Sequence, residues 1–170
     1  MNRSVIGCLM VGLCALLNGC AEPASTVGIP TASVNSMYLA EVEPAESMPV
    51  GEARERVEEG QEIALVGVIG GTRDPFVDGL AVFTIVDPAV PYCAAEEGCP
   101  TPWDYCCKQN QVKENIATVK LVDAAGELVE ENAKDLLGVS ELATIVAEGV
   151  AERDQQGNLT LMASKVFIRK

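Results

Sequence analysis

The stretch EIALVGVI, residues 62–69, is apolar on both of its alternating faces and is followed directly by Gly70 and Gly71. A short apolar run of this kind predicts a strand that is buried on both sides. The two glycines predict a sharp bend, because glycine tolerates the tight backbone turns found at barrel corners. The sequence therefore predicts a β-domain whose first long strand ends in a bend.

Further strand-like segments follow along the chain. Runs rich in β-branched and aromatic residues lie at 81–87, 116–123, 144–152 and 159–169, and the glycine-containing loop 154–158 predicts a hairpin between the last two. Residues 132–139 place Ala133, Leu136 and Leu137 on one helical face. A short charged helix or turn is expected at 52–59.

The order of these segments is strand, strand, strand, short helix, strand, strand, and residues 60–170 resemble the OB-fold family in this respect. The resemblance rests on the glycines of VGVIGG, on a second strand that ends FTIVD, and on the closing pair VAEGVAERD and LTLMASKVFI. It implies an all-β fold, a five-stranded OB-fold-like barrel with a cysteine-rich insertion between its second and third strands.

The first residues have the pattern of an export signal. Arg3 precedes an apolar run, residues 5–17, that is too short for a membrane-spanning helix. Residues 17–20, LNGC, resemble the lipobox of bacterial lipoproteins, in which the cysteine is acylated and becomes the new first residue. We therefore expect a signal peptide at 1–19 and a lipid anchor on Cys20. An ordinary secretory signal is the alternative.

The charge and composition after the signal indicate an anchored, acidic protein. Removal of residues 1–19 would leave 11 basic and 25 acidic residues, a formal charge of −14. Residues 20–49 contain four prolines and no lysine or arginine, which predicts a flexible acidic tether before a domain at 50–170. The expected location is extracytoplasmic and membrane-anchored, and Ala21 favours the outer membrane if the cell is Gram-negative.

The arrangement is most similar to a group of exported bacterial lipoproteins without an assigned activity. They share the lipobox, the acidic tether, GVIGG, PFVDG, AVFTIVD and CPTPWDYCC with this chain. The resemblance implies a fold and a location, and it leaves the ligand open.

Four of the seven cysteines lie in residues 92–107, YCAAEEGCPTPWDYCC. Cys8 and Cys14 would leave with the signal and Cys20 would hold lipid, so an even number remains in an oxidising compartment. We therefore favour two structural disulfides among Cys93, Cys99, Cys106 and Cys107. Cys93 would pair with Cys106 or Cys107, because a bond between the two adjacent cysteines closes a distorted small ring.

A metal site and a thiol-redox centre are the alternatives for the same four residues. The spacing Cys-x₅-Cys-x₆-Cys-Cys contains no C-x₂-C knuckle, and the chain contains no histidine. Zinc sites are often built from such knuckles, and redox centres from CxxC motifs. The pattern therefore argues against both alternatives, and no cofactor is expected unless the alternative with zinc holds.

Two loops carry residues that are typical of recognition surfaces. Tyr92, Trp103 and Tyr105 are aromatic residues of the cysteine segment, and rigid aromatics lose little entropy on contact with a partner. Arg73 and Phe76 lie in the loop between the first two strands, where OB-folds commonly bind ligands. The alternative for Trp103 is that it caps one end of the barrel.

The expected function is therefore a non-catalytic module that binds a protein, peptide or glycan of the cell envelope. The absence of histidine, of a G-x-S-x-G elbow and of a phosphate loop argues against an enzyme. The candidate ligand-binding residues are Arg73, Phe76, Tyr92, Trp103, Tyr105 and Arg153. A metal-binding or thiol-redox lipoprotein is the alternative function. Single-stranded nucleic-acid binding is a further alternative, but it needs a basic groove that this acidic chain does not predict.

Overall fold

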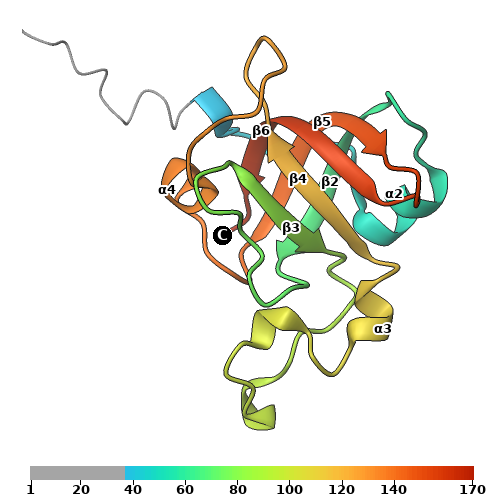
Figure 1. Cartoon of the computed structure of the whole chain (residues 1–170), viewed down its shortest axis with the longest axis vertical. Helices are drawn as coiled ribbons and strands as arrows, with labels where there is room; N and C mark the ends of the chain where they lie inside the picture. Colours follow the sequence, from blue (N-terminus) through green and yellow to red (C-terminus); the bar gives the residue numbers. More distant parts are fainter. Residues whose placement is uncertain (1–36) are drawn as a thin grey trace, which may run out of the picture.

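Five long strands close into a barrel in the computed structural model, which describes residues 37–170 (Figure 1). The predicted signal peptide, Cys20 and the tether as far as residue 36 lie outside the described residues. Within residues 37–170, no helix has the length and apolar character needed to cross a membrane.

The barrel strands are β2 (Glu62–Ile69), β3 (Val82–Val86), β4 (Ile116–Leu121), β5 (Thr144–Arg153) and β6 (Leu159–Ile168). They pair in the order β2-β3-β4-β6-β5, and an antiparallel pairing of β5 with β2 closes the barrel. β4 and β6 run parallel, and the other neighbouring barrel strands run antiparallel. Each strand lies close to its predicted position, and the predicted all-β OB-fold-like barrel is confirmed.

Short helices connect the strands. The helices are α2 (Val50–Arg56), α3 (Gln109–Val112) and α4 (Ala133–Leu137), with 3₁₀ turns η1 (Ala95–Glu97) and η2 (Pro102–Asp104). α4 lies between β4 and β5 in the chain and buries the three apolar residues predicted for one helical face. It ends at Gly138, whose φ of 67° is in the left-handed region that suits glycine at a helix C-terminus.

Residues 37–49, which were expected in the tether, contact the barrel. Tyr38 is buried, and Leu39 forms a parallel bridge with Val166 of β6. β1 (Ser47–Pro49) pairs in parallel with β2. The described fold therefore begins before Val50, the predicted start of the domain.

Three hydrophobic clusters lie in the described residues, and one of them is a small group of Ala64, Val66 and Val146. The main core fills the barrel, and strands such as β4 alternate between inward and outward side chains, as the two-residue period of a strand requires. A smaller cluster of Val86, Val90, Tyr105 and Val112 lies under the segment between β3 and β4. This segment, residues 88–115, is named the cysteine loop below. It projects from the lower end of the barrel in Figure 1.

Candidate functional site

The cysteine loop folds around the carboxylate of Asp104. Thr101 Oγ1 donates a hydrogen bond to Asp104 Oδ2 at 2.7 Å, and the backbone N–H of Cys106 donates to Asp104 Oδ1 at 2.8 Å. Tyr105, between them, has a φ of 54°, in the left-handed region. This turn reverses the chain, so that the last two cysteines return towards the start of the loop.

The loop is fastened to the bend that follows β2. The indole Nε1 of Trp103 donates to the carbonyl oxygen of Arg73 at 2.9 Å, and the N–H of Gly71 donates to the carbonyl oxygen of Trp103 at 2.8 Å. A Cβ at Gly70 would lie 2.6 Å from the Trp103 carbonyl oxygen. The predicted glycine bend is therefore also where the loop backbone approaches the barrel closely.

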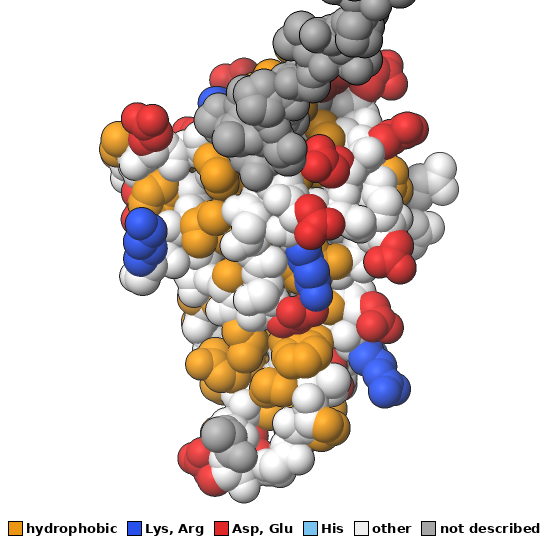
Figure 2. Space-filling model, turned by 90° about the vertical axis from the view of Figure 1, so that its left-hand side faces the viewer, with side chains coloured by type: hydrophobic (Ala, Val, Ile, Leu, Met, Phe, Trp, Pro, Cys, Tyr) orange, Lys and Arg blue, Asp and Glu red, His pale blue; other side chains and the backbone are white. Residues whose placement is uncertain are grey.

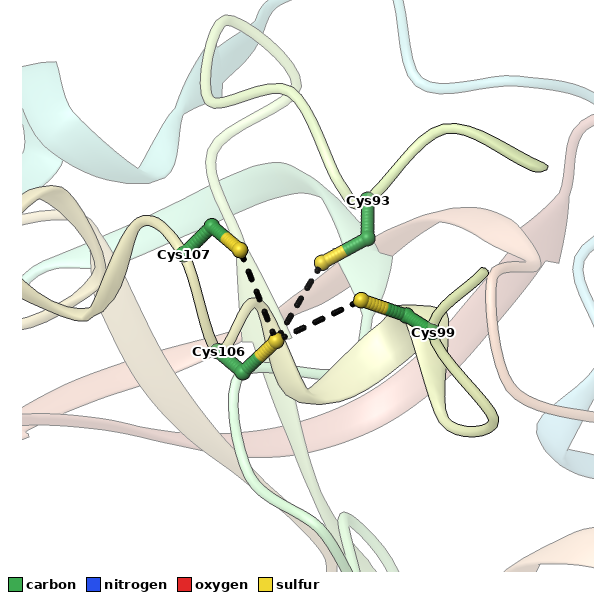
Figure 3. Close-up of side chains that lie close together, drawn as sticks. All are labelled: Cys93, Cys99, Cys106 and Cys107. Carbon is green, nitrogen blue, oxygen red and sulfur yellow. Dashed lines mark hydrogen bonds between the residues drawn. The ribbon is translucent and has the colours of Figure 1, made fainter. Parts of the chain in front are cut away.

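The fold brings the four cysteine sulfurs together. The Sγ atoms of Cys93, Cys99, Cys106 and Cys107 all lie within 4.8 Å of one another (Figure 3). Cys106 is at the centre of the group, 3.7 Å from Cys93, 3.5 Å from Cys99 and 3.7 Å from Cys107. Cys93 is buried, Cys99 is partly buried, and the two adjacent cysteines are exposed.

The three distances from Cys106 are close to the spacing of thiolates around one tetrahedral ion. A Zn–S bond of about 2.3 Å in tetrahedral geometry separates neighbouring sulfurs by about 3.8 Å. A disulfide needs about 2.05 Å, and two disulfides need two separate pairs of sulfurs. Here one sulfur lies 3.5–3.7 Å from each of the other three, so the four cysteines could hold one metal ion.

The sulfurs also influence one another's protonation. Burial raises the pKa of the Cys93 thiol, but hydrogen bonds from Cys99, from the Cys107 backbone N–H and from the thiols of Cys106 and Cys107 outweigh it, and the pKa is lowered. Hydrogen bonds with Cys99, Cys93 and Cys107 raise the pKa of Cys106. These neighbours therefore favour negative charge on the buried Cys93 sulfur and disfavour it on Cys106.

The favoured pairing into two disulfides stays a prediction. All four cysteines of the loop are free thiols in the described chain, at distances beyond bonding. The spacing along the chain did not indicate that the four sulfurs converge. The turn at Asp104 brings them together, as a C-x₂-C knuckle does in many zinc sites.

The three aromatic residues of the loop have different environments. Tyr92 is 49% exposed, whereas Tyr105 is fully buried in the smaller core cluster. Their rings meet edge-to-face at 6.5 Å. The expectation that Tyr105 belongs to an exposed aromatic surface is therefore wrong, because its left-handed backbone turns the ring under the loop. Its hydroxyl is buried and has no hydrogen-bond partner among residues 37–170.

The predicted residues of the β2–β3 loop lie beside the cysteine loop. The Arg73 carbonyl oxygen accepts the Trp103 hydrogen bond, which brings these two predicted residues together. Phe76 packs on Phe83 of β3 with ring centroids 5.9 Å apart, and the Lys134 ammonium lies 4.8 Å above the Phe76 ring. Phe76 therefore has a structural contact in the core as well as a position in a loop.

Arg153 is occupied by backbone contacts. Its guanidinium donates to the carbonyl oxygens of Ala53, Arg54 and Val57 at the C-terminus of α2, and to that of Gly157 in the hairpin loop. A cation at a helix C-terminus satisfies carbonyl groups that lack partners and complements the helix dipole. Arg153 thus holds α2 to the β5–β6 hairpin, a role that spacing along the chain could not reveal.

Comparisons with known proteins assign neither a family nor a function to this chain. Neither protein-family models nor curated proteins give a match to this chain. Among solved structures, the chain is similar to OBody AM1L10, determined bound to hen egg-white lysozyme, with 14% identity and a TM-score of 0.40. The match covers 76% of this chain and 98% of the other. A likeness at this level carries no argument about function.

Proposed function

We propose that this protein is a membrane-anchored, metal-binding OB-fold protein in which four cysteines of one loop hold a zinc ion. The observation that supports it is the convergence of the Sγ atoms of Cys93, Cys99, Cys106 and Cys107 within 4.8 Å of one another. A set of four thiolates in tetrahedral geometry suits zinc, because zinc is a borderline-soft ion without a redox role.

The environment of the sulfurs supports a thiolate centre. The backbone N–H of Cys107 contributes a hydrogen bond to Cys93, and such bonds stabilise the negative charge on sulfur. Cys106 and Cys107 are exposed, which gives an ion a direct path from solvent to two of its four ligands. A site with this access suits exchange of an ion as well as permanent binding.

The proposed location comes from the N-terminal sequence alone. The lipobox-like residues 17–20 would direct lipid attachment to Cys20, which would anchor the chain to a membrane. In a Gram-negative cell, Ala21 would favour the outer membrane. The barrel would then present the cysteine loop to the extracytoplasmic space, where free thiols oxidise unless a metal or a disulfide protects them.

Native mass spectrometry of the chain, purified from an oxidising compartment without reductant, tests the proposal. We expect one zinc per chain, and, once a chelator has removed the zinc, the mass of a chain with four reduced thiols. Replacement by Co²⁺ should give the strong red-region absorption of tetrahedral cobalt thiolates. A metal-free mass lower by four hydrogens would refute the proposal and establish two disulfides.

A single-site variant tests the ligand set by removing the central cysteine, Cys106, from the loop. Cys106→Ser should abolish stoichiometric zinc, since Cys106 Sγ is the atom nearest to all three others. A serine hydroxyl does not replace a thiolate as a zinc ligand, and Cys106→Ser retains the size of the side chain. Unchanged zinc content in this variant would contradict the assigned ligand set.

A second candidate function, recognition of an envelope partner, is supported by the surface beside the loop. Hydrophobic side chains gather on the lower half of the face in Figure 2, at the height of the cysteine loop. Tyr92 is 49% exposed, and Trp103 is held against the β2–β3 loop. Titration of the chain with soluble envelope glycan fragments, compared with a Tyr92→Ser variant, tests it. Equal binding by the two proteins, or none by either, would contradict this surface.

A further inference from the structure

A groove on the outside of the barrel lies over β2, β5 and β6. Its volume is about 770 Å³, and none of its lining residues comes from the cysteine loop. The apolar side chains that line it include Val150 and Met162. Four glutamates also line it: Glu46, Glu62, Glu148 and Glu152. It is therefore separate from the site described above in both position and chemistry.

The strand register explains how the groove is built. Val150 of β5 pairs directly with Glu62 of β2 on one side and with Met162 of β6 on the other. Directly paired residues share a face of the sheet, so these three side chains form one row across the outside of the barrel. Glu148 and Glu152 lie on the same face as Val150, because side chains alternate along a strand. Val150, between these two glutamates, is 37% exposed.

The four glutamates of the groove form no ion pair within residues 37–170. The ion pairs of this part of the chain involve Glu52, Glu141 and Glu43. Lys165 pairs in register with Glu148, and Lys120 with Met162, so two lysines stand at the β4 side. The carboxylates outnumber these two cations, and the net field of the groove is negative.

We propose that this groove binds a cationic amphipathic helix of a partner polypeptide. The adjacent strands β2, β5 and β6 span about 10 Å from the first to the last. A helix with its side chains is about 10–12 Å wide, so it fits across them. An apolar helical stripe would contact Val150 and Met162. Lysine or arginine side chains beside that stripe would reach the flanking glutamates, as long basic side chains do when their stems lie on apolar surface.

A synthetic peptide of leucine and lysine, with leucines at helical spacing along one face, is the probe. Its binding to the full chain is measured by calorimetry, beside a peptide of the same composition in scrambled order. We expect the amphipathic peptide to bind one per chain and the scrambled peptide to bind at least about tenfold more weakly. Equal affinity for the two peptides, or no binding, would overturn the proposal.

Two triple variants with the same change in net charge locate the binding. E62Q/E148Q/E152Q removes three charges at the groove, and E55Q/E114Q/E130Q removes three exposed charges that do not line it. The groove variant should weaken binding about tenfold, because it removes three exposed ion pairs with the peptide and their small contributions add. The control variant should weaken binding less than about twofold. Equal weakening by both variants would show attraction to net charge alone and overturn the proposal. Far-ultraviolet circular dichroism checks that both variants keep the barrel.

Discussion

The buried hydroxyl of Tyr105 predicts that Tyr105→Phe stabilises the cysteine loop. The ring is fully buried in the smaller cluster, and its hydroxyl has no hydrogen-bond partner in the described structure. A buried hydroxyl that loses its water without gaining a partner costs about 1–3 kcal/mol. Phenylalanine keeps the ring and removes this cost, so the free energy of unfolding should rise by about 1 kcal/mol.

Trp103 provides the assay, because it is the only tryptophan of the chain and lies in the same loop. Its fluorescence follows unfolding of the loop in urea, while far-ultraviolet circular dichroism follows the barrel strands. A gain of about 1 kcal/mol should move the fluorescence midpoint to higher urea without changing the slope. A midpoint at lower urea would show that the hydroxyl makes a stabilising bond, and the reasoning would fail.

The pH dependence provides an independent check on the same residue. Burial raises the pKa of Tyr105 from 10.0 to about 12, with smaller contributions from Tyr92 and Cys93. A raised tyrosine pKa means that the folded state favours the neutral phenol, which contributes stability below pH 10 that is lost as pH rises to about 12. The gap between Tyr105→Phe and the parent protein should therefore widen over that range. A constant gap would contradict burial of the phenol.

Three further substitutions have definite expected outcomes. Arg153→Ala should lower the free energy of unfolding by about 2–3 kcal/mol in urea titrations, since several backbone carbonyls lose a charged donor, and Arg153→Lys should recover only part of it. Gly149→Ala should lower it by several kcal/mol, because the added methyl would collide with the backbone of Met162 and Ala163, and intact stability would contradict the close β5–β6 approach. Cys99→Ser should reduce zinc affinity in competition with a coloured chelator, and an unchanged affinity would exclude Cys99 from the ligand set.

The strands could be predicted because their sequence pattern reports a local property. β2 matches its predicted range of 62–69, and β6 differs from its predicted range by one residue at the end. Both are runs of β-branched and apolar residues between glycine or polar turns, so the period and the punctuation agree. β1 was not predicted because it has only three residues and depends on pairing with β2 rather than on its own composition.

The candidate site could be predicted only in part. Its residues were visible, since the cysteines of the loop are concentrated in residues 92–107. Their convergence was not, because it depends on the Asp104 turn and on the left-handed backbone of Tyr105, which no spacing rule describes. Tyr105 is buried at this turn while Tyr92 stays exposed, a difference that the residue type alone could not indicate.

The separation of the barrel core from the small hydrophobic cluster under the cysteine loop determines what removal of the proposed zinc should do. The barrel core is built from β2 to β6 and α4, whereas the loop is held by Val86, Val90, Tyr105 and Val112. Val86 belongs to β3, so residues 88–115 supply only three buried side chains to this cluster. Three are few for a loop of this length, because ordering each residue costs about 1–2 kcal/mol. A zinc site contributes about 10–16 kcal/mol in small zinc-dependent domains, so the loop needs its cross-link far more than the barrel does.

Chelation should therefore unfold the loop and leave the barrel folded. Trp103 fluorescence should shift towards that of an exposed indole as its bond to the Arg73 carbonyl is lost, while the strand signal in circular dichroism persists. Hydrogen exchange should become fast in residues 88–115 and stay slow in β5 and β6, whose pairing does not involve the loop. Loss of both signals together would mean that barrel and loop form one cooperative unit. In that case the metal would be a determinant of the whole fold, and the division between the barrel core and the loop cluster would have no energetic meaning.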